Sequence, residues 1–137
     1  MRFRLILATA ATVALSMPLA ASAAKPIKNG DYADAKGTST GFHVNKAGTA
    51  IDKINIGMYK CSAIPWAPKG KPRIPITPAG KFSFRGLAQN VINKPAGKLV
   101  LTGTFLTPKL VSMTITHIKG ACTEKKTFRL KWFKPSS

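Results

Sequence analysis

Hydrophobic and polar residues alternate along much of the chain, which is the pattern of β-strands with one buried face. The clearest runs are residues 99–105 and 111–115, where hydrophobic residues occupy almost every second position. Phe128, Leu130 and Trp132 repeat the pattern near the C-terminus. Gly, Pro or Asn residues separate the runs, as in the turns of an all-β domain. The pattern therefore predicts a series of antiparallel strands.

An early strand shows a break in this alternation. Ile54, Ile56 and Met58 share one parity, whereas Ile51 is out of phase with them. A shift of one residue would turn the following side chains to the opposite face unless a bulge absorbs it. The sequence therefore predicts a β-bulge at residues 52–53.

The segment 62–78 differs from the rest of the chain because it contains five prolines. Proline lacks the N–H that a sheet requires and occurs in sheets mainly at edges and bulges. The segment is therefore expected to be a long extended loop. It carries Trp66, Lys69, Lys71 and Arg73, so the loop is expected to present an aromatic ring among cations.

The first 23 residues have the composition of a Sec-type signal peptide. Arg2 and Arg4 form a positive start, residues 5–19 are mostly apolar, and the segment ends in Ala-Ser-Ala. Small residues in this place mark a cleavage site, and the apolar run is too short for a spanning helix. We therefore expect cleavage after Ala23 and a secreted or periplasmic protein.

Removal of 23 of the 137 residues leaves 114, which is enough for one domain. Residues 24–37 are expected to form an N-terminal extension, and residues 38–134 a β domain. The expected fold is all-β, a single small antiparallel β-sandwich or barrel of about seven to nine strands. Alternation does not distinguish a sandwich from a barrel, because strand pairing decides between them.

The chain has two cysteines, Cys61 and Cys122. In an exported protein two cysteines most simply form one disulfide, and closing a loop of about 60 residues would stabilise the domain by roughly 4 kcal/mol. An intermolecular bridge and two free buried thiols are the alternatives. No metal site is expected, because two cysteines without further suitably spaced ligands are too few for one.

Several short motifs follow one another in a particular order. They are Gly30-x-Tyr32, Cys61, Gly80-x-Phe82-Ser83-Phe84, Leu101-x-Gly103-Thr104-Phe105, Cys122 and Trp132. This order resembles that of a loose group of uncharacterised secreted bacterial β-sandwich-like proteins. The resemblance covers most of the chain after residue 23. It implies the β fold and the disulfide, and it implies no activity.

The chain is strongly basic, with 22 Lys and Arg residues against four Asp and Glu residues. Without Arg2 and Arg4, 20 cations remain against the four carboxylates, a net charge of +16 with His neutral. Such a charge opposes folding by self-repulsion and attracts polyanions. Two interpretations stay open: the charge binds an anionic partner, or it serves solubility or an acidic habitat.

Two groups of cations are the candidate polyanion contacts. One lies in the proline-rich segment and the other follows the second cysteine: Lys69, Lys71 and Arg73, and Lys125, Lys126, Arg129, Lys131 and Lys134. They would form one patch if the loop and the last strand lay together. Trp66 would then stack on a sugar or a base, or else pack over the loop. Because lysine has no planar fork for reading base edges, sequence-specific nucleic-acid binding is not expected.

No constellation of catalytic residues is recognisable, and the protein is predicted not to be an enzyme. A glycosidase needs two carboxylates across the scissile bond, but Asp31 and Asp34 are expected to be solvated turn residues. His43 and His117 are expected to be ordinary strand histidines, since no Gly-x-Ser-x-Gly elbow accompanies them. No cofactor is expected.

The sequence therefore favours a non-catalytic binding module for anionic envelope or extracellular polymers. The expected partners are anionic polysaccharide, teichoic acid, lipopolysaccharide or an anionic membrane surface. The alternative is a structural or interaction protein of the cell envelope without a polyanion ligand. The sequence indicates no particular protein partner.

Overall fold

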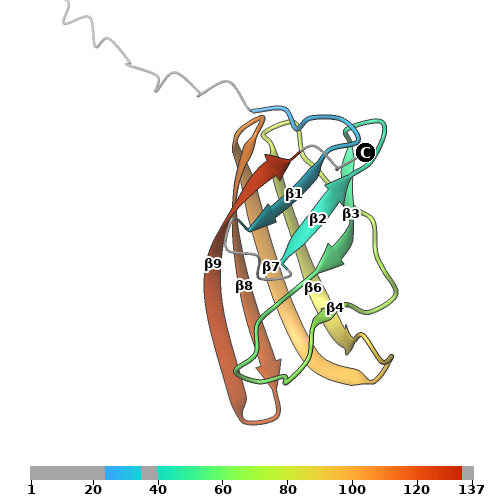
Figure 1. Cartoon of the computed structure of the whole chain (residues 1–137), viewed down its shortest axis with the longest axis vertical. Helices are drawn as coiled ribbons and strands as arrows, with labels where there is room; N and C mark the ends of the chain where they lie inside the picture. Colours follow the sequence, from blue (N-terminus) through green and yellow to red (C-terminus); the bar gives the residue numbers. More distant parts are fainter. Residues whose placement is uncertain (1–23, 35–39, 134–137) are drawn as a thin grey trace, which may run out of the picture.

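The computed structural model describes residues 24–34 and 40–133, which form one sheet of nine strands. The strands are β1 (Asp31–Asp34), β2 (Gly41–Val44), β3 (Ala50–Asn55), β4 (Trp66–Pro68), β5 (Ile74–Pro75), β6 (Lys81–Asn90), β7 (Pro95–Thr107), β8 (Leu110–Lys119) and β9 (Cys122–Phe133). Their order is β4-β6-β7-β8-β9-β1-β2-β3-β5, all neighbours are antiparallel, and Figure 1 shows the sheet curled into a half-barrel. The predicted all-β class is thus confirmed. The predicted signal peptide, residues 1–23, lies outside the described residues.

Strands β6 to β9 form a meander of long strands, and their alternate residues build much of the core. Leu99, Leu101 and Phe105 of β7 are buried, as the alternation predicts. Neighbouring ring centroids lie 5.4 to 6.1 Å apart in a cluster of four aromatic residues: Tyr32, Phe42, Phe82 and Phe105. Aromatic rings bury large apolar areas and pair in tilted arrangements, so this cluster ties β1 and β2 to β6 and β7.

The two ends of the sheet meet at a bridge between Ile56 and Trp66. The N–H of Ile56 donates to the carbonyl of Trp66 at 2.8 Å, and the N–H of Trp66 donates to the carbonyl of Ile56 at 3.1 Å. Ile56 follows β3 and Trp66 begins β4, so the bridge joins strands that are far apart in the sheet order. Both side chains are fully buried, which anchors this closure in the core.

The boundary between the expected extension and the β domain is wrong, because residues 31–34 form β1. This strand pairs with both β2 and β9. Its pattern is weak because Tyr32 is its one fully buried residue. The Tyr32 hydroxyl accepts the N–H of Ile27 and donates to the carbonyl of Pro108. A tertiary contact therefore holds the strand, and its two aspartates are strand residues rather than turn residues.

The proline-rich segment 62–78 is also more ordered than an extended loop, since it contains β4 and β5. These strands have three and two residues, and each ends in a proline, Pro68 and Pro75. They occupy the two ends of the strand order, where one side of a strand needs no further N–H donors. The proline rule therefore excluded central strands correctly but not short edge strands.

The predicted bulge in β3 is present. The pairing of β2 with β3 shifts register between Gly41 and His43, whose partners are Asn55 and Asp52. Lys53 lies in this interval with a positive φ of 47°. Ile51 and Ile54 are both buried despite their different parity. The extra residue is thus absorbed as the alternation indicates.

Cys61 and Cys122 form an intramolecular disulfide across a sequence separation of 61 residues, as predicted. The bond ties the loop after β3 to the start of β9. It suggests an oxidising, extracytoplasmic environment. In the part of the chain that the structure describes, no helix has the length and apolar character needed to cross a bilayer.

Candidate polyanion-binding face

The outward side of β6 to β9, here called the basic face, carries three rows of residues aligned across the strands. The register between neighbouring strands places hydroxyl side chains in the middle row and cations at both ends of the flanking rows. The rows are Lys81–Thr104–Ser112–Arg129, Ser83–Thr102–Thr114–Thr127 and Arg85–Val100–Thr116–Lys125. Most of the alternate residues of the same strands are buried or partly buried, which turns these rows toward solvent.

Four cations therefore frame an array of hydroxyl groups. Strands lie about 4.8 Å apart and rise about 3.3 Å per residue, so Lys81, Arg85, Lys125 and Arg129 mark the corners of a rectangle of about 13 by 14 Å. Within it Thr114 and Thr127 share a hydrogen bond of 2.8 Å between their hydroxyl oxygens. The outward positions of these four described strands include no Asp or Glu. This face has donors and positive charge without a competing carboxylate.

A shallow hollow lies over part of the basic face. Its volume is about 580 Å³, and Lys81, Ser83, Thr102, Thr104 and Ser112 are among the residues that line it. Hydroxyl and ammonium groups donate hydrogen bonds to phosphate, sulfate or carboxylate oxygens. The hollow can therefore hold one charged group of a longer anion.

Three of the four acidic residues lie on the other part of the sheet. Asp31 and Asp34 are in β1 and Asp52 is in β3. The Nδ1 of His43 donates to the Asp31 carboxylate at 2.7 Å across β1 and β2. The charge is therefore unevenly distributed: β1 to β3 mix both signs, whereas the outward side of β6 to β9 is purely positive.

The predicted cations of β9 divide between two sides of that strand. Lys125, Arg129 and Lys131 are exposed at alternate positions on the basic face. Lys126 has the opposite parity, and its Nζ lies 4.9 Å from the ring centroid of Phe128. Lys134 lies outside the described residues. Three of the five cations predicted near the C-terminus thus share one face.

Of the predicted cations of the proline-rich segment, Lys69 reaches the edge of this face, where it lines a pocket with Leu87 of β6 and Lys98 of β7. Lys69 and Lys71 follow β4, and Arg73 precedes β5. In the strand order, β6, β7 and β8 separate β4 from β9. The single patch expected from the two groups is therefore not formed, because the loop and the last strand lie apart in the sheet.

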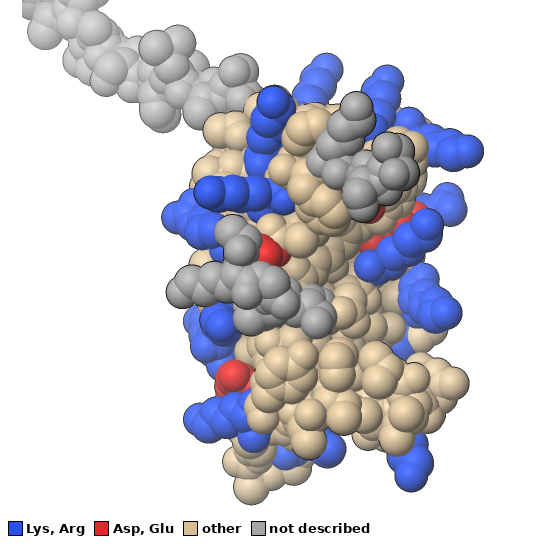
Figure 2. Space-filling model, viewed as in Figure 1, with Lys and Arg blue, Asp and Glu red and all other residues tan. Residues whose placement is uncertain are grey.

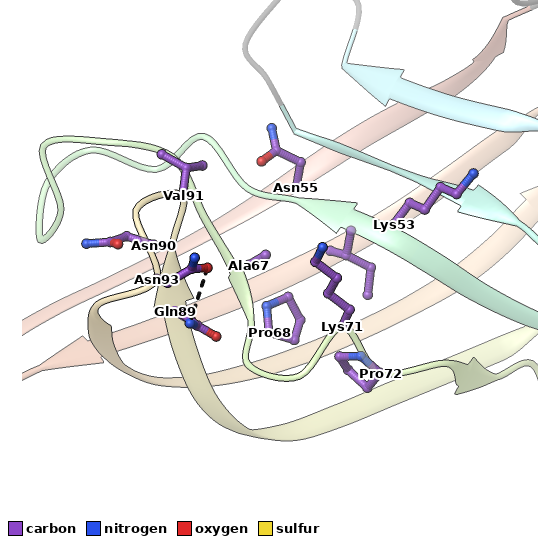
Figure 3. Close-up of a pocket in the computed structure, with 11 residues that line it drawn as sticks. Lys53, Asn55, Ala67, Pro68, Lys71, Pro72, Gln89, Asn90, Val91 and Asn93 are labelled. Carbon is purple, nitrogen blue, oxygen red and sulfur yellow. Dashed lines mark hydrogen bonds between the residues drawn. The ribbon is translucent and has the colours of Figure 1, made fainter.

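Lys71 instead lines a groove of about 400 Å³ between β3 and β4, here called the seam groove. Figure 3 shows Lys53 and Lys71 toward one end of this groove and the amides of Gln89, Asn90 and Asn93 toward the other. The Gln89 and Asn93 amides are joined by a hydrogen bond of 3.4 Å. The groove is polar and positively charged, but it is small beside the basic face.

Trp66 has no exposed surface with which to stack on a ligand, so of the two expectations for this residue the structure favours packing inside the protein. Its Nε1 donates to the carbonyl of Met58 at 3.1 Å. Its ring stacks on His117 with a centroid distance of 4.0 Å. Trp66 is therefore a core residue, because its ring and its donor are both satisfied inside the protein.

His117 and Glu124 lie beside the disulfide, and their ligand atoms and the Cys61 sulfur are within 4.8 Å of one another. The Nε2 of His117 donates to the carbonyl of Ala96, whereas its buried Nδ1 has no partner. Because the Cys61 sulfur is bonded to Cys122, it is not a thiolate ligand. One imidazole and one carboxylate fall short of the three protein ligands of a zinc centre. The absence of a metal and of catalysis stays a prediction.

Sequence reasoning missed Lys81 and Arg85 and the hydroxyl rows between them and β9. These residues lie at outward positions of their strands. Such positions on neighbouring strands can be assembled into a surface only when the register between the strands is known. Cations also project around the whole outline of the molecule in Figure 2. What separates the basic face from other surfaces is the combination of aligned hydroxyls and missing carboxylates, not the presence of lysine alone.

The fold and this face define a basic, disulfide-bonded all-β domain. Comparison with family models, with curated proteins and with solved structures finds no match. A function is therefore inferred from the residues of the chain itself.

Proposed function

We propose that this protein is a non-catalytic extracytoplasmic module that binds anionic polymers through its basic face. The observation that carries the proposal is the purely positive, hydroxyl-lined outward side of β6 to β9. A polymer with phosphate, sulfate or carboxylate groups gains charge-assisted hydrogen bonds there and releases its counterions. Residues 1–23 act as the cleaved signal that exports the protein to the periplasm or the medium.

A role as a structural protein that recruits partners by strand addition draws less support. Strand addition needs a free, regular strand edge. The strands at the two ends of the order are short and end in Pro68 and Pro75, and Ile56 pairs with Trp66 next to β4. These features protect the edges, so they favour recognition through a sheet face.

The test is affinity for heparin and for a poly(glycerol phosphate) teichoic acid as a function of salt. The double variant Lys81→Ser/Arg129→Ser removes two cations of one row on the basic face. We expect about tenfold weaker binding at low salt and a log-affinity against log-salt slope that is smaller by about one per cation removed.

The matched control is Lys28→Ser/Lys46→Ser, which removes the same charge from exposed positions outside β6 to β9. This control is expected to retain most of the affinity. Equal losses in the two double variants would show that net charge alone attracts the polymer and would overturn the proposed face. No salt-dependent binding of either polymer to the wild type would overturn the function itself.

A further inference from the structure

Exposed hydrophobic side chains gather at one end of the molecule, here called the disulfide end. It consists of the loop 57–65 and the turns 91–94 and 120–121, which Figure 1 shows together at the lower end of the view. The described residues include seven large hydrophobic side chains that are exposed. Five of them belong to this end or to the row next to it: Tyr59, Leu87, Val91, Ile92 and Ile118. Large exposed apolar groups that gather in one place mark an interaction surface.

The β6–β7 turn holds the most exposed of these residues in a rigid frame. Val91 and Ile92 are each 58% exposed. The Oδ1 of Asn90 accepts the N–H of Ile92 at 3.1 Å and the N–H of Lys94 at 2.9 Å. The Asn90 carbonyl accepts the N–H of Asn93, and the N–H of Val91 donates to a carbonyl of the neighbouring loop.

The internal acceptors of these N–H groups lower the cost of moving the turn out of bulk water. A backbone N–H that leaves water without a partner loses a hydrogen bond, which normally keeps turns out of an apolar medium. Here all four amides from Val91 to Lys94 already have acceptors within the protein. The backbone N–H groups of the turn therefore need no water, and its two branched apolar side chains can enter the headgroup layer, where water still solvates the carbonyls.

The charges around this end are complementary to an anionic surface. Lys60, Lys94, Lys98 and Lys119 are exposed on the same loop, turns and adjoining strand ends. The one nearby carboxylate in the described chain, Glu124, is partly buried and accepts the N–H of Lys60 at 3.2 Å. Apolar residues at a tip with lysines behind them are the arrangement by which proteins dock on the interface of a negatively charged bilayer.

We propose that the disulfide end docks on anionic phospholipid bilayers, with Val91 and Ile92 inserted at the level of the headgroups and the four lysines facing lipid phosphates. The apolar anchors of this binding site lie on a turn beyond the three rows of the basic face, whereas Lys98 belongs to the outward side of β7. Tyr59, which is 48% exposed, supplies an aromatic ring at the same end. Such rings favour the membrane interface.

The experiment is co-sedimentation of the mature protein with phosphatidylcholine vesicles that contain or lack phosphatidylglycerol. We expect salt-sensitive binding to the anionic vesicles. The variant Val91→Asp/Ile92→Asp should bind at least about tenfold more weakly, since it replaces both apolar anchors with charges that the interface rejects. The control Leu106→Asp places a charge on a hydrophobic residue that is 45% exposed at the opposite end of β7 and should bind as the wild type does.

A second readout locates the insertion directly. A tryptophan in the variant Ile92→Trp should shift its emission to the blue on anionic vesicles and be quenched by lipids with brominated acyl chains. The unchanged wild type provides the baseline from Trp66 and Trp132. An absent shift, or equal binding by the Val91→Asp/Ile92→Asp variant and the wild type, would overturn the proposal.

The test also separates this inference from the polymer proposal. The Val91→Asp/Ile92→Asp variant should retain its affinity for heparin, and the Lys81→Ser/Arg129→Ser variant should retain most of its vesicle binding. If the wild type without lipid is a dimer that Val91→Asp/Ile92→Asp dissociates, this end is an interface between copies of the chain. That result would overturn the membrane proposal and leave the polymer proposal standing.

Discussion

The two sides of strands β6 to β9 are made from alternate residues of the same four segments. On the inward side, Leu99, Leu101 and Ile115 have at most 1% of their surface exposed. On the outward side, Thr102 and Thr114 belong to the hydroxyl row between the two rows that end in cations, and they remain in contact with solvent. The difference separates stability, which the inward side provides, from the polymer recognition that we propose for the outward side. A substitution on one side should therefore leave the property of the other side unchanged.

The largest effect that tests this separation is expected at the disulfide. The variant Cys61→Ala/Cys122→Ala removes a cross-link over 61 residues, and the free energy of unfolding in urea should fall by about 4 kcal/mol. The reason is the larger conformational entropy of the unfolded chain, so polymer affinity should not change while the variant is folded. Wild type reduced by a dithiol is the control and should show the same loss. A parallel decline of heparin affinity would break the comparison.

A smaller effect distinguishes the two sides within one strand. At Gly103 a Cβ atom would overlap the Cζ of Phe82, so Gly103→Ala must displace a ring of the aromatic cluster. We expect a loss of about 1 to 3 kcal/mol in unfolding free energy. The neighbour Thr102→Val keeps the β-branched shape on the outward side and should change stability by less than about 0.5 kcal/mol. Urea unfolding of both variants tests this, and a larger loss at Thr102 would contradict it.

The smallest effect concerns Tyr32, at the inward side of β1. Burial raises the pKa of Tyr32 above its ordinary value of 10.0, although the hydrogen bond from the N–H of Ile27 lowers it in part. The folded state then holds the phenolic proton more tightly than the unfolded chain. This contribution is complete below pH 10.0 and is lost as the pH rises through the pKa of the folded state.

The variant Tyr32→Phe checks this effect. It should cost about 1 kcal/mol near neutral pH, because it removes the hydroxyl that contacts Ile27 and Pro108. Its stability should also decline less steeply than that of the wild type above pH 10.0, as measured by urea unfolding along a pH series. An unchanged alkaline decline would show that other groups cause it.

Much of the fold could be predicted from the sequence, because the long strands bury one side only. Residues 99–105 and 111–115 alternate so regularly that their inward and outward sides follow from parity. The bulge in β3 was predictable from the break in alternation, and the disulfide was predictable because the chain has two cysteines. β1 was not, since Tyr32 is its one fully buried residue and its hydrogen bonds reach distant segments.

The candidate site was less predictable, because it depends on strand order and register. Lys125, Arg129 and Lys131 could be assigned to one face from parity, but their neighbours Lys81 and Arg85 lie more than 35 residues away in the sequence. The separation of Lys69, Lys71 and Arg73 from β9 follows from the three strands between β4 and β9. The interior position of Trp66 depends on a tertiary contact with His117, which the local sequence does not reveal.

The proline-ended strands β4 and β5 also bear on how many copies can crowd together. A polymer concentrates the proteins that bind it, and crowded sheets with open edges tend to pair into fibrils. Pro68 and Pro75 remove backbone donors at the two terminal strands, each of which has only two or three residues. If the proposed polymer binding crowds copies of this domain together, these short proline-ended strands should disfavour pairing between their sheet edges.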